Sequence, residues 1–475
     1  MFTKFLCSNN VESFILELKN RFFEFAQGTK TADAVSRSLF FLHIDKFIFA
    51  ALLLTFASAP FLSTSGIGFF VLLFIALVAL KLLVKKGEKF TMTPIDAAVA
   101  LFFALSILSL MGSTLFWASF HGFLKVMVYI AFYFCLTHYL RENKSKIWTV
   151  LALVAVLISF ESVVGILQNF GGVLEIAGWQ DTSNLEVNEI ISRAYGTLKP
   201  FNPNLLAGYI LPGLAVLFYF FTLNLVSKQK KRALTFAALI FLSLLTLIYT
   251  GCRGAYIGII AFFACCAGWA IHYITTRYGS FSNLKKRWKN TIIVASTGFL
   301  VFLFANPAIL KRIFSIFAFR EDSSISFRMN VYKSSWAMFL DNPIFGIGLG
   351  NQNFREIYGL YMLTGFDALG AYSVPLEIAV EMGLLGLASF FAILFIAFYR
   401  AVLFLRSDVP QTQEKLLIFS MLMLIALLMT HGLIDTIFYR PQVQMLFWFA
   451  LAVININAQP CPISQPSSRS RQKKQ

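Results

Sequence analysis

Long apolar stretches alternate with short polar segments along most of the chain. A helix needs about 20 consecutive apolar residues to cross the hydrocarbon core of a bilayer, and these stretches approach or reach that length. The pattern therefore predicts an all-α, polytopic membrane protein of about twelve spanning helices. The predicted spans are 47–63, 66–84, 95–112, 117–140, 147–170, 204–226, 232–250, 253–275, 290–307, 375–399, 414–434 and 441–458.

Basic residues gather in every second gap between these stretches and in the C-terminal tail, and together these segments hold more than half of the 40 Lys and Arg. Examples are Lys85 and Lys86, Lys230–Arg232 and Lys285–Arg287. Cytoplasmic loops of membrane proteins are enriched in Lys and Arg. The pattern therefore predicts an inner (plasma) membrane protein whose two termini are both cytoplasmic.

Composition narrows the class further. Apolar residues make up 58% of the chain and charged residues 13%, against about 45–50% and about 25% in soluble domains. These values exclude a soluble enzyme, a disordered chain and a disulfide scaffold. The net charge of +17 is spread over many loops, so we expect membrane lipid and no nucleic acid as a partner. Five scattered His and six Cys without CxxC spacing predict neither a metal nor another cofactor.

The chain divides into three parts. Residues 1–46 suit a cytoplasmic amphipathic segment, 47–458 a transmembrane domain, and 459–475 a disordered basic tail in the cytoplasm. Two predicted outer loops, 171–203 and 308–374, are long, and long loops are uncommon unless functional. The second contains SFRMNVYKSSWAMFL, which suits a helix at the membrane interface, followed by the glycine-rich turn GIGLGN.

Arginines on the outer side oppose the charge pattern of the loops. Four stand out on or near predicted outer loops: Arg193, Arg253, Arg328 and Arg440. Gly251 and Gly254 leave backbone room around Arg253 for a bulky anion. A guanidinium binds phosphate through a planar fork, so we expect these arginines to bind an anionic substrate. An arginine that snorkels to the interface is the simpler alternative.

The segment RAYGTLKPFNPNLLAGY, just before the sixth predicted span, adds Lys199 and Asn202 to the candidate substrate-binding residues. Asn and Pro are also common turn formers. Asn202 therefore has two interpretations, a contact with a ligand or a turn that leads into the span.

Ionisable residues near the outer ends of the last spans are candidate catalytic groups, because such groups are rare at membrane depth. Glu377 and Glu381 are four residues apart, as are His431 and Asp435, so each pair is expected on one helix face. His431 and Asp435 could form a base with its orienting carboxylate, or a structural hydrogen bond between helices.

Several motifs occur in a specific order: NPNLLAGY, CRGAYIG, FRMNVYKSSWAMFLDNPIFGIGLGN, AYSVPLEIAVEMGLLGL and HGLIDTIFYRPQ. Over about residues 190–450 they resemble the O-antigen ligase/polymerase superfamily of bacterial membrane proteins. Within it the chain looks most similar to the IctB-type branch, which is labelled as inorganic carbon (bicarbonate) transporters.

The resemblance implies roles for individual residues. Arg253 and Arg328 match the family's arginines that hold the diphosphate of an undecaprenyl-linked glycan. The family's catalytic His falls at or next to Tyr372, where this chain departs from the ligase pattern. A tyrosine is a poor base near pH 7, because its ordinary pKa is about 10.

The sequence thus favours a metal-independent glycosyltransferase that acts on a lipid-diphosphate-linked glycan at the extracytoplasmic face. The acceptor would be a glycan, a lipid or a protein, and Tyr372, Glu377, His431 and Asp435 are the candidate catalytic residues. Two alternatives stay open, a transporter for bicarbonate and a protein that binds lipid-linked glycans without catalysis.

Overall fold

The computed structural model describes residues 35–85, 92–170, 193–278, 323–407 and 412–457. These residues are predominantly helical, with no strand among them. Nine of the described helices are long and apolar enough to cross a membrane. The predicted class, an all-α polytopic membrane protein, is confirmed.

The described helices, in chain order, begin with α4 and end with α19. Their bounds are α4 Leu39–Leu42, α5 Ile44–Ala57, α6 Thr64–Val84, α7 Pro94–Met111, α8 Phe116–Glu142, α9 Lys146–Phe170, α10 Pro203–Val226, α11 Lys230–Tyr249, α12 Arg253–Tyr278, α15 Ser323–Asp341, α16 Asn351–Tyr358, α17 Val374–Arg406, α18 Thr412–Gly432, the 3₁₀ helix η3 Ile437–Tyr439 and α19 Pro441–Ile456.

Every predicted span except the ninth coincides with one of these helices. The ninth, 290–307, lies outside the described residues, as do the predicted tail 459–475 and most of the segment 1–46. Among the helices that match predicted spans, α5 with 14 residues and α19 with 16 are the shortest.

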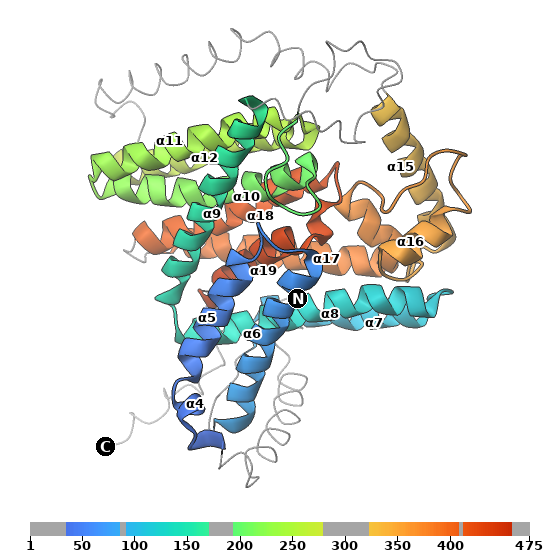
Figure 1. Cartoon of the computed structure of the whole chain (residues 1–475), viewed down its shortest axis with the longest axis horizontal. Helices are drawn as coiled ribbons and strands as arrows, with labels where there is room; N and C mark the ends of the chain where they lie inside the picture. The colour runs from blue at the N-terminus through green and yellow to red at the C-terminus, as the bar shows by residue number, and fades with distance from the viewer. Residues whose placement is uncertain (1–34, 86–91, 171–192, 279–322, 408–411, 458–475) are drawn as a thin grey trace, which may run out of the picture.

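The helices α10 and α19 form the core of the bundle. Every residue of α19 is buried, and so is most of α10. α10 packs on α9, α11, α12 and α18, and α19 packs on α8 and α18. Figure 1 shows α11 and α12 along one edge of the bundle, with α7 and α8 on the opposite side of the core. A helix that is apolar on all sides is expected at such a central place.

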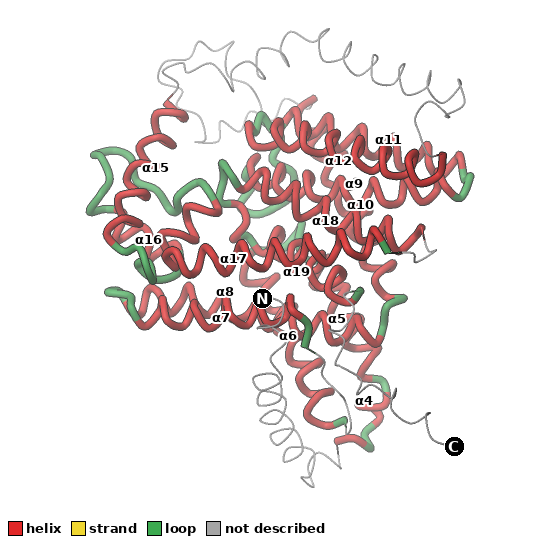
Figure 2. The backbone as a smooth tube through the Cα atoms, turned by 180° about the vertical axis from the view of Figure 1, so that it is seen from behind, coloured by secondary structure: helices red, strands yellow, loops and turns green. Residues whose placement is uncertain are grey.

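The helices α15 and α16 lie together at one end of the bundle, as Figures 1 and 2 show from opposite sides. We call this the α15 end. The turn between α7 and α8 belongs to it, because Gly112 in that turn lies beside the Cβ atom of Phe345, which follows α15.

The helix α17 is broken at Gly383, whose φ of 67° and ψ of −168° are not helical. The segment 343–350 lies against the break and replaces the missing helical hydrogen bonds. Leu384 N donates to the Pro343 carbonyl at 2.7 Å, and Ile347 N donates to the Val380 carbonyl at 2.9 Å. Backbone groups inside a bilayer need such partners. The sequence predicted an uninterrupted span at 375–399, and the break at Gly383 corrects this, whereas GIGLGN does lie in a turn segment as expected.

Candidate functional site

Residues 193–202 fold back into the bundle because two polar side chains of α9 hold them there. The carboxylate of Glu161 is fully buried and accepts hydrogen bonds from the backbone N–H, at 2.9 Å, and the hydroxyl of Thr197. About two turns further along α9, the side chain of Gln168 accepts a hydrogen bond from Gly196 N at 2.8 Å and donates one to the Gly196 carbonyl at 3.0 Å. A buried carboxylate is tolerated where hydrogen bonds satisfy it.

The folding back of this segment places Arg193 between the end of α11 and the start of α10, close to the turn that follows α18. Its Nε atom donates to the Thr250 carbonyl at the end of α11 at 2.7 Å, and its Nη2 atom donates to Asn204 Oδ1 at 3.0 Å. The amide nitrogen of Asn204 donates in turn to Asp435 Oδ2 at 2.9 Å. A chain of polar contacts thus connects Arg193 to the turn after α18.

Arg328 reaches the same carboxylate from α15. Its Nη2 atom lies 3.6 Å from Asp435 Oδ2, and its guanidinium carbon lies 5.7 Å from the centre of the Tyr372 ring. The hydroxyl of Tyr332, one turn along α15, donates to the Tyr372 carbonyl at 3.1 Å. Arg328 lies in the second turn of α15 because the helix already begins at Ser323, earlier than the sequence suggested.

His431 and Asp435 do not share a helix face. The helix α18 ends at Gly432, so Asp435 lies in the following turn, where its Oδ1 atom accepts from Thr436 N at 2.8 Å. Helical spacing applies only within a helix, and the interpretation of this pair as helical neighbours is wrong. Among the described residues the hydrogen-bonding partner of the imidazole is instead a cysteine.

That cysteine is Cys252, in the turn between α11 and α12. Its sulfur lies 3.2 Å from His431 Nε2, and both side chains are buried. Burial raises the pKa of the Cys252 thiol, but the nearby His431 lowers it by more, so the net pKa lies below its ordinary value. Gly254 lets His431 approach α12, since a Cβ atom there would lie 2.8 Å from the ring. Arg253, the first residue of α12, is therefore adjacent to this pair.

The two glutamates at the start of α17 have different surroundings. Glu377 is fully buried, and its Oε2 atom accepts from Ala371 N at 3.1 Å. Its Oε1 atom has no hydrogen-bond partner among the described residues. Glu381 accepts from Gly350 N at 2.8 Å and so takes part in closing the break in α17. Glu377 thus keeps one buried oxygen without a partner among the described residues.

Tyr372, a predicted catalytic residue, lies in the connection before α17. Its φ of 50° is unusual for a residue with a side chain. Burial raises the pKa of its hydroxyl and Asp435 raises it further, whereas Arg328 opposes the shift. A higher pKa makes a tyrosine a still poorer base near pH 7.

The other predicted binding residues surround the cluster. Asn202 caps α10 by accepting from Asn204 N at 2.8 Å, which is the turn-forming role. The side chain of Lys199 is exposed, and its carbonyl accepts from Gln442 Nε2 at 3.3 Å. Arg440 precedes α19, where burial lowers its pKa and Asp435 opposes the shift.

Sequence reasoning missed the residues that connect the cluster. Asn204 and Cys252 lie in the quoted motifs NPNLLAGY and CRGAYIG, but neither spacing nor residue type indicated their partners. Gln168 lies in an apolar span, where a polar side chain is the available signal. Among the described residues no group of three or more His, Cys, Asp or Glu could hold a metal ion.

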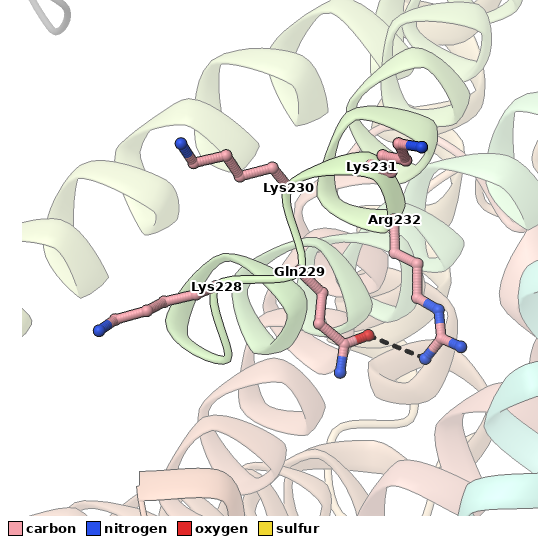
Figure 3. A pocket seen from close by; sticks show the side chains of 5 residues that line it. All are labelled: Lys228, Gln229, Lys230, Lys231 and Arg232. Carbon is pink, nitrogen blue, oxygen red and sulfur yellow. Dashed lines mark hydrogen bonds between the residues drawn. The ribbon is translucent and has the colours of Figure 1, made fainter.

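A separate hollow of about 490 Å³ lies at the turn between α10 and α11. Figure 3 shows its lining residues, in which Arg232 donates a hydrogen bond to Gln229 at 2.8 Å. The cluster around Asp435 contacts the opposite end of α10, near Asn204. The hollow is therefore not part of the candidate site.

Fold and site together define a polytopic helical membrane protein with a cluster of arginines and buried acids at one end of its bundle. Residues 237–391 match the family model described as O-antigen ligase. This match confirms the resemblance to the O-antigen ligase/polymerase superfamily and supports a ligase/polymerase-like glycosyltransferase in general. The matched region contains Arg253, Arg328, Tyr372 and Glu377. No curated protein matches the chain.

Proposed function

We propose that this protein is a metal-independent glycosyltransferase that acts on a glycan linked to a lipid diphosphate, of undecaprenyl type, at the extracytoplasmic face of the inner membrane. The observation that carries the proposal is that Arg193 and Arg328 come from separate segments and both connect to Asp435. A diphosphate is recognised by guanidinium groups that converge on it from different directions. Arg253, the residue that follows Cys252 in the chain, is the third cation of this proposal.

The arginines would stabilise the leaving group. An acceptor hydroxyl attacks the anomeric carbon of the donor glycan, and the bond from that carbon to the phosphate oxygen breaks. The electron pair stays on the lipid diphosphate, whose growing charge Arg253 and Arg328 offset. In this scheme Asp435 and Asn204 orient the arginines when no substrate is bound.

We propose Glu377 as the group that takes the proton from the acceptor. Its Oε1 atom is buried and has no partner among the described residues, which leaves it available to a hydroxyl. Tyr372 is less suited because burial raises its pKa, and the Nε2 atom of His431 already contacts Cys252. The acceptor is a glycan, a lipid or a protein.

The activity is tested with Arg328→Ala. Cells that lack the native protein would carry either the wild type or the variant, and their surface glycans would be separated on a gel. We expect the glycan-bearing bands to fall by about 10²- to 10³-fold, the usual effect of losing one group that stabilises transition-state charge. Membrane levels of the two proteins are compared by immunoblot.

Arg355→Ala is the matched control. Arg355 pairs with Asp367 and is exposed at the α15 end, so it is a nearby arginine outside the cluster. We expect wild-type banding from it. Unchanged banding with Arg328→Ala at a normal membrane level would refute the proposal.

Transport of a small anion such as bicarbonate, the activity of the IctB-type branch, is the second candidate. The break in α17 favours it, because transporters often bind substrates at broken helices. However, segment 343–350 and Ser109 take up the backbone groups that the break releases. Uptake of labelled bicarbonate by vesicles that contain this protein alone would support transport. Binding of a lipid-linked glycan without any transfer would instead indicate a non-catalytic binder.

A further inference from the structure

One face of α15 is apolar and exposed. Met329, Trp336 and Leu340 are 47%, 53% and 57% exposed, with Lys333 exposed between them. Their spacing of four, three and four residues places all four in one stripe along the helix. The opposite side of α15 is buried against the protein through Val331, Ser334, Ser335 and Met338.

The exposed stripe continues into the surface of the spanning helices. Ile344 and Phe345, which follow α15, are also exposed. Phe345 lies beside Gly112 at the end of α7, and Pro343 accepts a hydrogen bond from Leu384 of α17. Leu384 is itself 58% exposed on a helix that is long and apolar enough to cross a membrane.

The helix α15 runs across the end of the bundle, whereas α7, α8 and α17 run along it (Figures 1 and 2). Its direction is therefore close to the plane of a bilayer that α7, α8 and α17 cross. An amphipathic helix in that plane buries its apolar face at the boundary between headgroups and acyl chains. A lysine within such a stripe can extend its ammonium to the headgroups.

We propose that the stripe Met329–Leu340 with Ile344 and Phe345 is a lipid-binding surface, on which α15 rests in the bilayer interface. Continuity with the exposed face of α17 distinguishes lipid from a protein partner. Trp336 suits this depth, since tryptophan is enriched at membrane interfaces.

The lipid-binding surface also bears on the substrate, a step that rests on the proposed function. Arg328 is the residue before Met329, so a stripe in the interface puts its guanidinium near the level of the lipid headgroups. Phosphates of a lipid-linked substrate lie at that level. The site would then receive its donor laterally from the bilayer and not from water.

Spin labelling tests the surface independently of any activity. In a background whose native cysteines are replaced by serine, a nitroxide is attached to single cysteines introduced at Met329, Trp336 or Leu340. The labelled full-length protein is reconstituted into phosphatidylcholine vesicles. Power saturation then measures collisions with oxygen, which concentrates in the acyl chains, and with a water-soluble nickel complex.

We expect all three labels to show high oxygen and low nickel accessibility, close to a label at Leu101, an exposed residue of the spanning helix α7. A label at Glu356, exposed on α16, serves as the aqueous control. Nickel accessibility like that at Glu356 would place the stripe in water and overturn the proposal. Low accessibility to both reagents would mean that protein covers the stripe, and this result would also overturn the proposal. Three positions keep the test valid if one variant does not fold.

Discussion

At the scale of single residues, Asp435 organises the candidate site. Its carboxylate accepts from Asn204 and from the backbone of Thr436, and it faces Arg328. An aspartate inside a group of arginines keeps their charges compensated without a ligand. Removing one partner of a partly buried pair leaves the other charge without compensation.

Asp435→Ala should therefore destabilise the protein, by about 1–3 kcal/mol for the lost hydrogen bonds and the uncompensated Arg328. The unfolding temperature of the purified protein in detergent measures the effect. Asp367→Ala is the control, because its pair with Arg355 is exposed on both sides and such pairs contribute about 0–1 kcal/mol. Equal unfolding temperatures for the two variants would contradict the role of Asp435.

At the scale of elements, the decisive feature is the fit of segment 343–350 into the break of α17. Gly383 has a positive φ, which a residue with a Cβ atom adopts at a cost. A Cβ atom there would also lie 2.2 Å from the Ile344 carbonyl oxygen, so no larger residue fits without moving the backbone. The break in turn fixes the start of α17, which carries Glu377.

We expect Gly383→Ala to prevent folding of this region, seen as loss of the monodisperse peak in size-exclusion chromatography of the solubilised protein. Gly268→Ala on α12 is the matched control, because nothing lies within 4 Å of a Cβ atom at that position. The variant with Ala at position 268 should elute as the wild type does. A normal elution profile for Gly383→Ala would show that the break is not required.

At the scale of the whole molecule, the distribution of charge predicts orientation. The basic turn Lys228–Arg232 connects α10 to α11, whereas the cluster around Asp435 contacts the opposite end of α10. Lys and Arg are retained on the cytoplasmic side during insertion. The α15 end would therefore be extracytoplasmic.

Cysteines introduced at Thr364 and Gln229, both exposed, test this orientation. A membrane-impermeant maleimide applied to spheroplasts should label Thr364→Cys at once and Gln229→Cys only after permeabilisation. The opposite pattern would place the candidate site in the cytoplasm and exclude the proposed extracytoplasmic reaction.

The sequence by itself determined the class of the protein and the approximate positions of the spanning helices that the structure describes. Both follow from the length of apolar runs and from local capping residues such as Thr93 and Asn202, which act over a few residues. It also singled out Arg193, Arg328, Glu377 and Asp435, because ionisable groups are costly near a membrane.

Only the tertiary structure decided how these residues meet. The break at Gly383 depends on hydrogen bonds to a segment that precedes it by more than thirty residues, and the partner of His431 is Cys252 in the distant turn between α11 and α12. The link from Arg193 to Asp435 passes through Asn204, which lies 231 residues before Asp435 in the chain. Local sequence patterns do not indicate such contacts, because the packing of segments that are distant in the chain brings the partners together.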